Sequence, residues 1–179
     1  MTARRDQRIS TPRTVLTPIT IADADEMVEV LAGCELYAFI GGQPPDVDQL
    51  RAQYAKLVVG HSDDGSQDWY NWIVRIRATG RAIGTVQATV MAEGTRANVA
   101  WIIGLPWQGQ GYASEATRAM VRWLIQGGIE YITAHIHSDH VASEAVARKA
   151  GLRATDDVYD GERRWTVQAG SPPIERDRL

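Results

Sequence analysis

The order of elements between residues 97 and 137 constrains the fold most strongly. The run "ANVAWIIG" (97–104) alternates apolar and polar residues as a strand does, and so does "YITAHIH" (131–137). Between them, "SEATRAMVRWLIQGG" (114–128) places apolar side chains at helical spacing and ends at two glycines. A strand–helix–strand unit of this kind joins two parallel strands by a right-handed crossover. The chain therefore predicts a parallel strand pair with a helix packed on it.

The flanking segments predict an α/β (α+β) fold with a mixed, mostly antiparallel sheet of six or seven strands and helices on both faces. Turns at "ATGR" and "AEGTR" join three alternating runs into a meander. Thr20, Asp46 and Ser143 are the expected N-caps of three further helices. The expected elements are strands 13–19, 69–77 and 82–91, helices 20–33, 47–60 and 143–151, and a hairpin over 153–168 that turns at Asp160-Gly161.

Length and composition predict one cytoplasmic domain. The 179 residues suffice for one buried core, which we place at 13–168, between a disordered segment at 1–12 and a frayed tail at 169–179. A net charge of −3 without long runs of like charge argues against nucleic acid, and no apolar stretch is long enough for a membrane span. The single cysteine, Cys34, excludes an internal disulfide and favours a reducing compartment. A monomer or a homodimer fits this composition.

The glycine-rich stretch "WQGQGYASE" (107–115) predicts an anion site. It follows a strand and opens a helix, where backbone N–H groups lack partners and the helix dipole favours negative charge. Gly109 and Gly111 let a ligand approach the backbone closely, and Ala113 is nearly as small. A P-loop is excluded because Gly-Lys-Ser/Thr is missing, and the intervening "GLPWQ" disfavours a dinucleotide fold. Coenzyme A, held by its pyrophosphate, is the remaining phosphate ligand.

Two segments resemble the GNAT superfamily of N-acetyltransferases. In "IIGLPWQGQGYASEA", Gln108, Gly111 and Ala113 match the coenzyme-A-binding signature, with Ile103 at the preceding apolar position. In "HSDHVASEAVARKAGL", Ser143 matches a second landmark and His140 stands where the family usually has Asn. The sequence around "GYASEA" is most similar to the branch that includes ribosomal-protein alanine acetyltransferases (RimJ/RimL type).

The resemblance implies an acetyl-CoA-dependent N-acetyltransferase with the parallel strand pair splayed apart. The acceptor is a primary amine of a small molecule or a protein N-terminus, which attacks the thioester directly in a ternary complex; no metal takes part. The pyrophosphate would lie on the glycine-rich amides and the pantetheine arm along the preceding strand. The implied coenzyme-binding residues are Ile102, Ile103, Gln108, Gly109, Gln110, Gly111, Tyr112, Ala113, Ser114 and His140.

The proton-handling residues are less clear from the sequence. Many relatives carry a Tyr where this chain has Ala147 and a Glu where it has Asn98, so the general base is unassigned. His137 and Ser143 are the catalytic candidates, for proton transfer and for a contact to the thioester sulfur. Each residue also has a purely structural interpretation: His137 as a hydrogen-bonded histidine of the sheet, and Ser143 as the N-cap of a helix. The missing groups also leave open a non-catalytic acyl-CoA-binding sensor of the same fold.

Several aromatic residues are expected near the acceptor. Trp101 and Trp165 are the tryptophans we place beside an acceptor pocket, and Tyr37 and Phe39 come from the loop that would shape it. Cys34 is expected to be a buried apolar residue.

Overall fold

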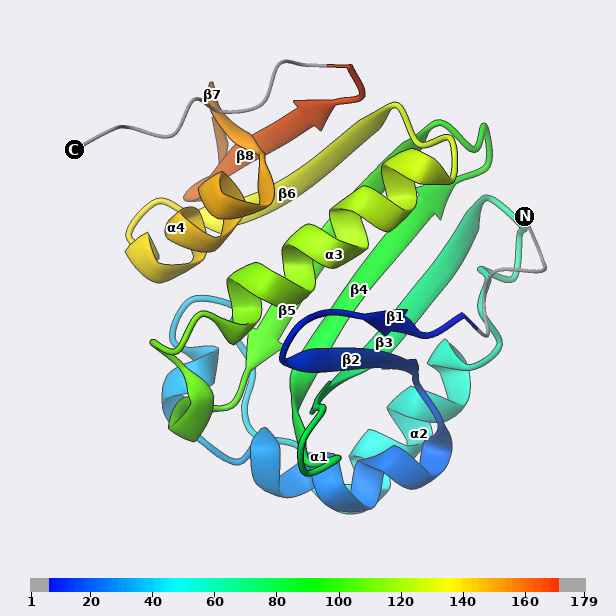
Figure 1. Cartoon of the computed structure of the whole chain (residues 1–179), viewed down its shortest axis with the longest axis vertical. Helices are drawn as coiled ribbons and strands as arrows, with labels where there is room; N and C mark the ends of the chain where they lie inside the picture. The colour runs from blue at the N-terminus through cyan, green and yellow to red at the C-terminus, as the bar shows by residue number, and fades with distance from the viewer. Residues whose placement is uncertain (1–6, 171–179) are drawn as a thin grey trace.

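The computed structural model describes residues 7–170 and contains one eight-stranded sheet in that range. The strand order is β1-β2-β3-β4-β5-β6-β8-β7, with every neighbouring pair antiparallel except β5 and β6 (Figure 1). The strands are β1 (Ile9–Ser10), β2 (Thr14–Pro18), β3 (Gln67–Ile76), β4 (Ala82–Met91), β5 (Arg96–Ile103), β6 (Tyr131–His137), β7 (Arg153–Tyr159) and β8 (Glu162–Gln168).

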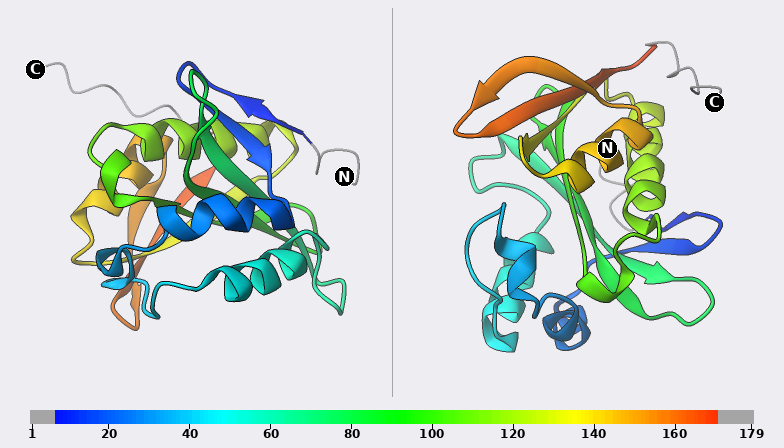
Figure 2. Two further views of the ribbon diagram at one scale, coloured as in Figure 1. Left: turned by 90° about the horizontal axis from the view of Figure 1, so that it is seen from below. Right: turned by 90° about the vertical axis from the view of Figure 1, so that its left-hand side faces the viewer.

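Helices cover both faces of this sheet, as predicted (Figure 2). One apolar core lies between the sheet and α3 and α4, and a second lies between the sheet and α1 and α2. Met120 and Leu124 of α3 are fully buried in the first core, and Met27 of α1 in the second. The α-helices are α1 (Ala24–Val30), α2 (Val47–Leu57), α3 (Tyr112–Gln126) and α4 (Val141–Ala150). No helix in residues 7–170 has the length and apolar character to cross a bilayer.

The parallel pair separates soon after it begins. β5 and β6 are paired only from Arg96–Asn98 to Tyr131–Thr133, so the remaining halves of the two strands diverge. β5 stays paired with β4 from Ala97 through Ile103, and β6 stays paired with β8 through His137. The sheet is therefore open along a seam between the second half of β5 and the second half of β6.

The structure corrects two expected element boundaries. β1 pairs with β2 at Ile9–Ser10, inside the segment predicted to be disordered, and it brings the sheet to eight strands instead of six or seven; residues 1–6 lie outside the described residues. Helix α4 begins at Val141 with His140 as its N-cap residue, so Ser143 is not the N-cap but lies in the first turn. The predicted N-caps at Thr20 and Asp46 are confirmed, and each residue forms a capping box.

Three smaller expectations are wrong. Helix α1 ends at Val30, before Gly33, whose φ of −72° is an ordinary value that any residue adopts. Helix α2 ends at Leu57, short of the expected residue 60, and Val58, which follows it, is 44% exposed. Cys34 is exposed because it lies in a short 3₁₀ turn (Cys34–Tyr37) whose buried residue is Leu36.

Candidate active site

The glycine-rich loop ends in two left-handed residues that leave backbone donors unpaired. Gly109 and Gly111 have φ of 72° and 81°, which L side chains rarely adopt, and Gly111 is the N-cap residue of α3. The first main-chain bond of the helix is donated by the Glu115 amide to the Gly111 carbonyl. Among the described residues, no acceptor pairs with the amides of residues 109–114, and residues 108–111 are exposed. These donors, at the positive end of a helix, can hold an anion.

Arg13 holds this loop in place, and sequence analysis did not identify it. Its Nε donates to Glu115 Oε2 at 2.7 Å, and its Nη1 donates to the Gln110 carbonyl at 3.0 Å. Its guanidinium lies 4.6 Å from the centre of the Tyr112 ring. Burial alone would raise the pKa of Glu115, but hydrogen bonds from Thr11 and Arg13, and the charge of Arg13, lower it. The carboxylate therefore stays ionised, and Arg13 adds a cation beside the free amides.

We expect Arg13→Gln to raise the apparent Kd for coenzyme A about fivefold, because a partly exposed charge and one loop contact are lost. Isothermal titration at low and high salt measures this, and the difference between the two proteins should shrink as salt rises. Arg122→Gln on the exposed side of α3 is the matched charge control. Equal weakening by both substitutions would show that only net charge matters.

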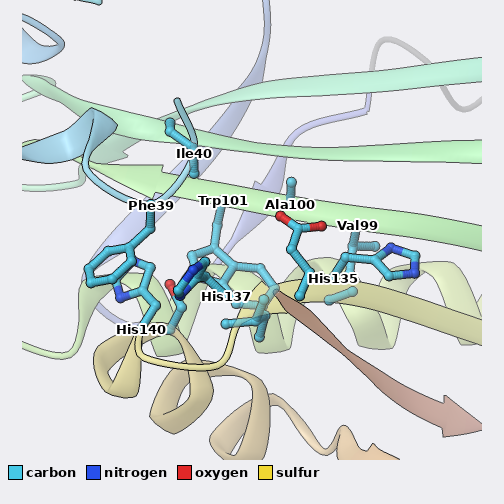
Figure 3. A pocket seen from close by; sticks show the side chains of 12 residues that line it. Phe39, Ile40, Val99, Ala100, Trp101, His135, His137 and His140 are labelled. Carbon is cyan, nitrogen blue, oxygen red and sulfur yellow. The ribbon is translucent and has the colours of Figure 1, made fainter. Parts of the chain in front are cut away.

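The open seam contains a small cavity of about 80 Å³. It is lined by β5 on one side and β6 on the other, with Phe39 and Ile40 approaching from the loop between α1 and α2 (Figure 3). The main-chain pairing of β5 with β6 has already ended at Asn98, so this part of β5 is unpaired on its β6 side. The Gln108 side chain donates to the Ile103 carbonyl at 2.9 Å and thereby fixes the junction between this strand edge and the glycine-rich loop.

Three rings meet at the end of the seam. Phe39 stacks on His140 with ring centres 4.5 Å apart and lies 5.3 Å from His137 (Figure 3). His137 Nδ1 accepts a hydrogen bond from the Asp139 amide at 3.2 Å, which favours the neutral tautomer that carries its proton on Nε2. That nitrogen lies against Gly161, only 3.3 Å from where a Cβ would stand. Any proton transfer by His137 therefore has to use Nε2 beside the β7–β8 turn.

Acid should destabilise the protein through His140. Burial, and then the charge of His137, lower the pKa of His140 below its usual value near 6.5. The unfolded chain therefore binds more protons at this site, and stability falls as pH drops through about 6.5 toward the lower folded-state pKa. We expect the Tm of the wild-type protein to fall between about pH 7 and pH 5. In His140→Asn the Tm should fall less over the same range. His135→Asn, at an exposed position of β6, should leave the fall in Tm unchanged.

The structure brings most of the predicted site residues into one continuous region. His137, Ser143, His140 and Trp101 all line the seam cavity, and the end of β5, followed by a short 3₁₀ turn (Leu105–Trp107), leads from it into the glycine-rich loop. Trp165 does not line the cavity; it is 2% exposed in the core, below Arg148. His135 lines the cavity too. Within residues 7–170, no three His, Cys, Asp or Glu side chains are grouped so that they could hold a metal ion.

An opened parallel strand pair that runs into a helix-capping glycine loop is the architecture of GNAT-type acyltransferases. The family model described as "Acetyltransferase (GNAT) domain" matches residues 13–153. The chain therefore belongs to the GNAT acetyltransferase-domain family. A search of curated proteins found no match to the chain.

Solved structures share this fold at low sequence identity. RimJ of Mycobacterium smegmatis in complex with a CoA-disulfide is 15% identical with a TM-score of 0.77, covering 92% of this chain and 88% of that one. The ribosomal-protein alpha-N-acetyltransferase RimL in complex with coenzyme A is 15% identical with a TM-score of 0.75, covering 90% and 98%. The aminoglycoside acetyltransferase AAC(6')-Ib in complex with coenzyme A is 17% identical with a TM-score of 0.70, covering 87% and 94%.

Proposed function

We propose that this protein transfers an acetyl group from acetyl-CoA to a primary amine by direct attack in a ternary complex. The observation that carries the proposal is the continuity of the site: an unpaired strand edge leads through one short 3₁₀ turn into a loop of free backbone donors. Acetyl-CoA would supply the acetyl group as a thioester, whose carbonyl carbon is activated toward attack by an amine, and coenzyme A would leave as the free thiol. The similar solved structures of RimL, a ribosomal-protein acetyltransferase, and of AAC(6')-Ib, an aminoglycoside acetyltransferase, contain coenzyme A, which supports this choice of acetyl donor.

Each segment of the site would contact one part of the coenzyme. The amides of Gly109, Gln110, Gly111, Tyr112 and Ala113 would bind the pyrophosphate, with Ser114 at the start of α3. Gln108 would keep the loop against β5, and Ile102 and Ile103 would pair with the pantetheine amides as a neighbouring strand does. His140, the N-cap residue of α4, would contact the same arm. A β5 amide near Ile102 would donate to the carbonyl oxygen as negative charge develops on it.

Proton transfer is assigned to the β6 end of the seam. His137 would take the proton of the attacking amine or return one to the departing thiolate, and Ser143 would contact the sulfur. Ala147 has only a methyl side chain, so that position offers no proton donor. Because His137 Nε2 lies beside Gly161, we expect a relay through water and a decrease of only about tenfold in kcat for His137→Asn, below the range for directly placed acids and bases. A pH–rate profile in which the substitution removes no limb would exclude His137 as the proton carrier.

The test of the overall function is release of free thiol from acetyl-CoA in the presence of a panel of primary amines. We expect amine-dependent thiol release and an acetylated amine detectable by mass spectrometry. A protein that is stabilised thermally by acetyl-CoA but acetylates no amine would support the alternative, a non-catalytic acyl-CoA-binding sensor. The absence of the Tyr at Ala147 is the observation that favours this alternative.

A further inference from the structure

A second cavity of about 420 Å³ opens beside the seam, on the side of the sheet that α1 and α2 cover. Ile40, Ala100 and Trp101 line both cavities, so the two meet at these residues. A molecule in the larger cavity would therefore reach the seam past Ala100. The inference below rests on the proposed function, because it assigns this cavity to the amine acceptor.

The lining of the larger cavity carries no charged side chain among the described residues. Its polar groups are neutral, and four of them are primary amides that have no hydrogen-bond partner within residues 7–170. Apolar side chains, including Ile19, Leu31 and Leu57, form the rest of the wall. The four amides are Gln43, Gln53, Asn71 and Gln87.

The fold brings these amides together from three separate segments. Asn71 of β3 is directly opposite Gln87 of β4, which is directly opposite Ala100 of β5, so the three form a row across the sheet. Gln53 comes from α2 and Gln43 from the loop that precedes it. This row leads from the amide-rich part of the cavity to Ala100, which lines both cavities.

Three charged groups on this side of the sheet, Arg75, Asp23 and Glu26, pair with one another and do not line the cavity. Arg75 pairs with Asp23 at 2.5 Å and with Glu26 at 2.7 Å. Burial, and then the charge of Asp23, raise the pKa of Tyr54, so its hydroxyl stays protonated and remains a hydrogen-bond donor. The Tyr54 hydroxyl and Asn71 Nδ2 are buried without a partner in the described residues. Occupants that offer carbonyl oxygens would match such donors.

We infer that this cavity binds an uncharged, amide-bearing portion of the acceptor, directly attached to a single reactive amine. A primary amide both donates and accepts, so it can pair with another amide group. A polyamine would bring further ammonium groups, and a free amino acid would bring a carboxylate, into a cavity that supplies no opposite charge. Both should be poor acceptors, although each has a primary amine.

The experiment compares four acceptors at fixed, saturating acetyl-CoA. Alaninamide and an alanine tripeptide amide carry one amine and uncharged amides, whereas alanine carries a carboxylate and spermidine carries several ammonium groups. We expect kcat/KM for the two amides to exceed that for alanine and spermidine by at least about tenfold. The ratio between alaninamide and the tripeptide amide then distinguishes a small amide-bearing molecule from a peptide N-terminus.

Substitutions at Gln87 connect this preference with the cavity. We expect Gln87→Leu to lower kcat/KM for the amides about tenfold, and Gln87→Glu to shift the preference toward spermidine. Gln53→Leu, on the exposed side of α2, provides an independent test if a β4 substitution affects folding. Gln126→Leu, at the exposed end of α3 and outside both cavities, should change neither value.

The outcomes separate this inference from the proposed function. Acetylation that favours spermidine or alanine, or that is indifferent to Gln87 and Gln53, would overturn the inference while leaving acetyl transfer intact. If no amine is acetylated, the proposed function fails, and ligand-observed NMR still tests the cavity. Saturable alaninamide binding that Gln87→Leu weakens would support amide recognition, and no such binding would overturn it.

Discussion

Gly111→Val is expected to weaken coenzyme A binding by about 100-fold or more. Gly111 has a φ of 81°, a conformation that costs an ordinary L residue about 1–2 kcal/mol and a β-branched residue more. A Cβ there would also lie 3.4 Å from an Arg13 nitrogen that belongs to the network holding the loop. Relief of this strain would turn the 109–114 amides away from their common direction. Loss of two charge-assisted hydrogen bonds, at about 1.5–3 kcal/mol each, accounts for the expected factor.

Gly128→Val is the matched control for backbone strain. Gly128 also has a positive φ, 97°, and lies just beyond the other end of α3, with no atom near its absent Cβ. Both variants should lose stability in thermal unfolding, but only Gly111→Val should lose coenzyme A affinity in titration calorimetry. Unchanged affinity in Gly111→Val would mean that the loop amides do not hold the coenzyme.

Local sequence patterns were sufficient to predict the glycine loop and most of the elements around it. Gly109 and Gly111 could be assigned a role because a strand, a glycine pair and a helix start follow one another within a few residues. The Asp160-Gly161 turn was predictable for the same reason, and both residues have the positive φ that a tight hairpin turn requires. The separation of β5 from β6, by contrast, could be predicted only from the family resemblance, because the sequence of each strand alone has the pattern of an ordinary paired strand.

Contacts between distant segments were not predictable from one sequence. Arg13 acts on the glycine loop through Glu115, which lies 102 residues away along the chain, and no local pattern connects the two. β1 was missed because two residues gain their strand geometry only by pairing with β2. Likewise, the amide-lined cavity forms where α2 and its preceding loop pack over β3 and β4. Each of its glutamines alone looks like an ordinary exposed polar residue.

Ser143 lines the seam cavity, although the N-cap position predicted for it is wrong. Ser is a strong N-cap residue, and the apolar pattern of α4 made its position look like the first of the helix. The helix instead starts two residues earlier, which moves Ser143 into the first turn, where it lines the seam cavity. Its predicted contact to the thioester sulfur stays a prediction.

Ala100→Trp is expected to lower kcat/KM for amine acetylation by about 100-fold while leaving coenzyme A affinity within about threefold of wild type. Ala100 lines both the seam and the larger cavity, so a side chain added there stands between the acceptor and the thioester. A misplacement of the reacting groups by about 1 Å can cost two orders of magnitude in rate. The loop amides at 109–114 lie outside both cavities and should still bind the pyrophosphate.

Asn98→Trp supplies the matched control for Ala100→Trp. Asn98 is exposed on the same face of β5, two residues earlier, where β5 is still paired with β6 and neither cavity reaches. Steady-state acetylation kinetics and calorimetric titration of coenzyme A should separate the two variants. If Ala100→Trp acetylates amines as fast as Asn98→Trp does, the amine cannot approach past Ala100, and its route to the seam must begin elsewhere. If both substitutions abolish coenzyme A binding, bulk on β5 disturbs the sheet itself, and the division between an acceptor side and a coenzyme side of Ala100 is wrong.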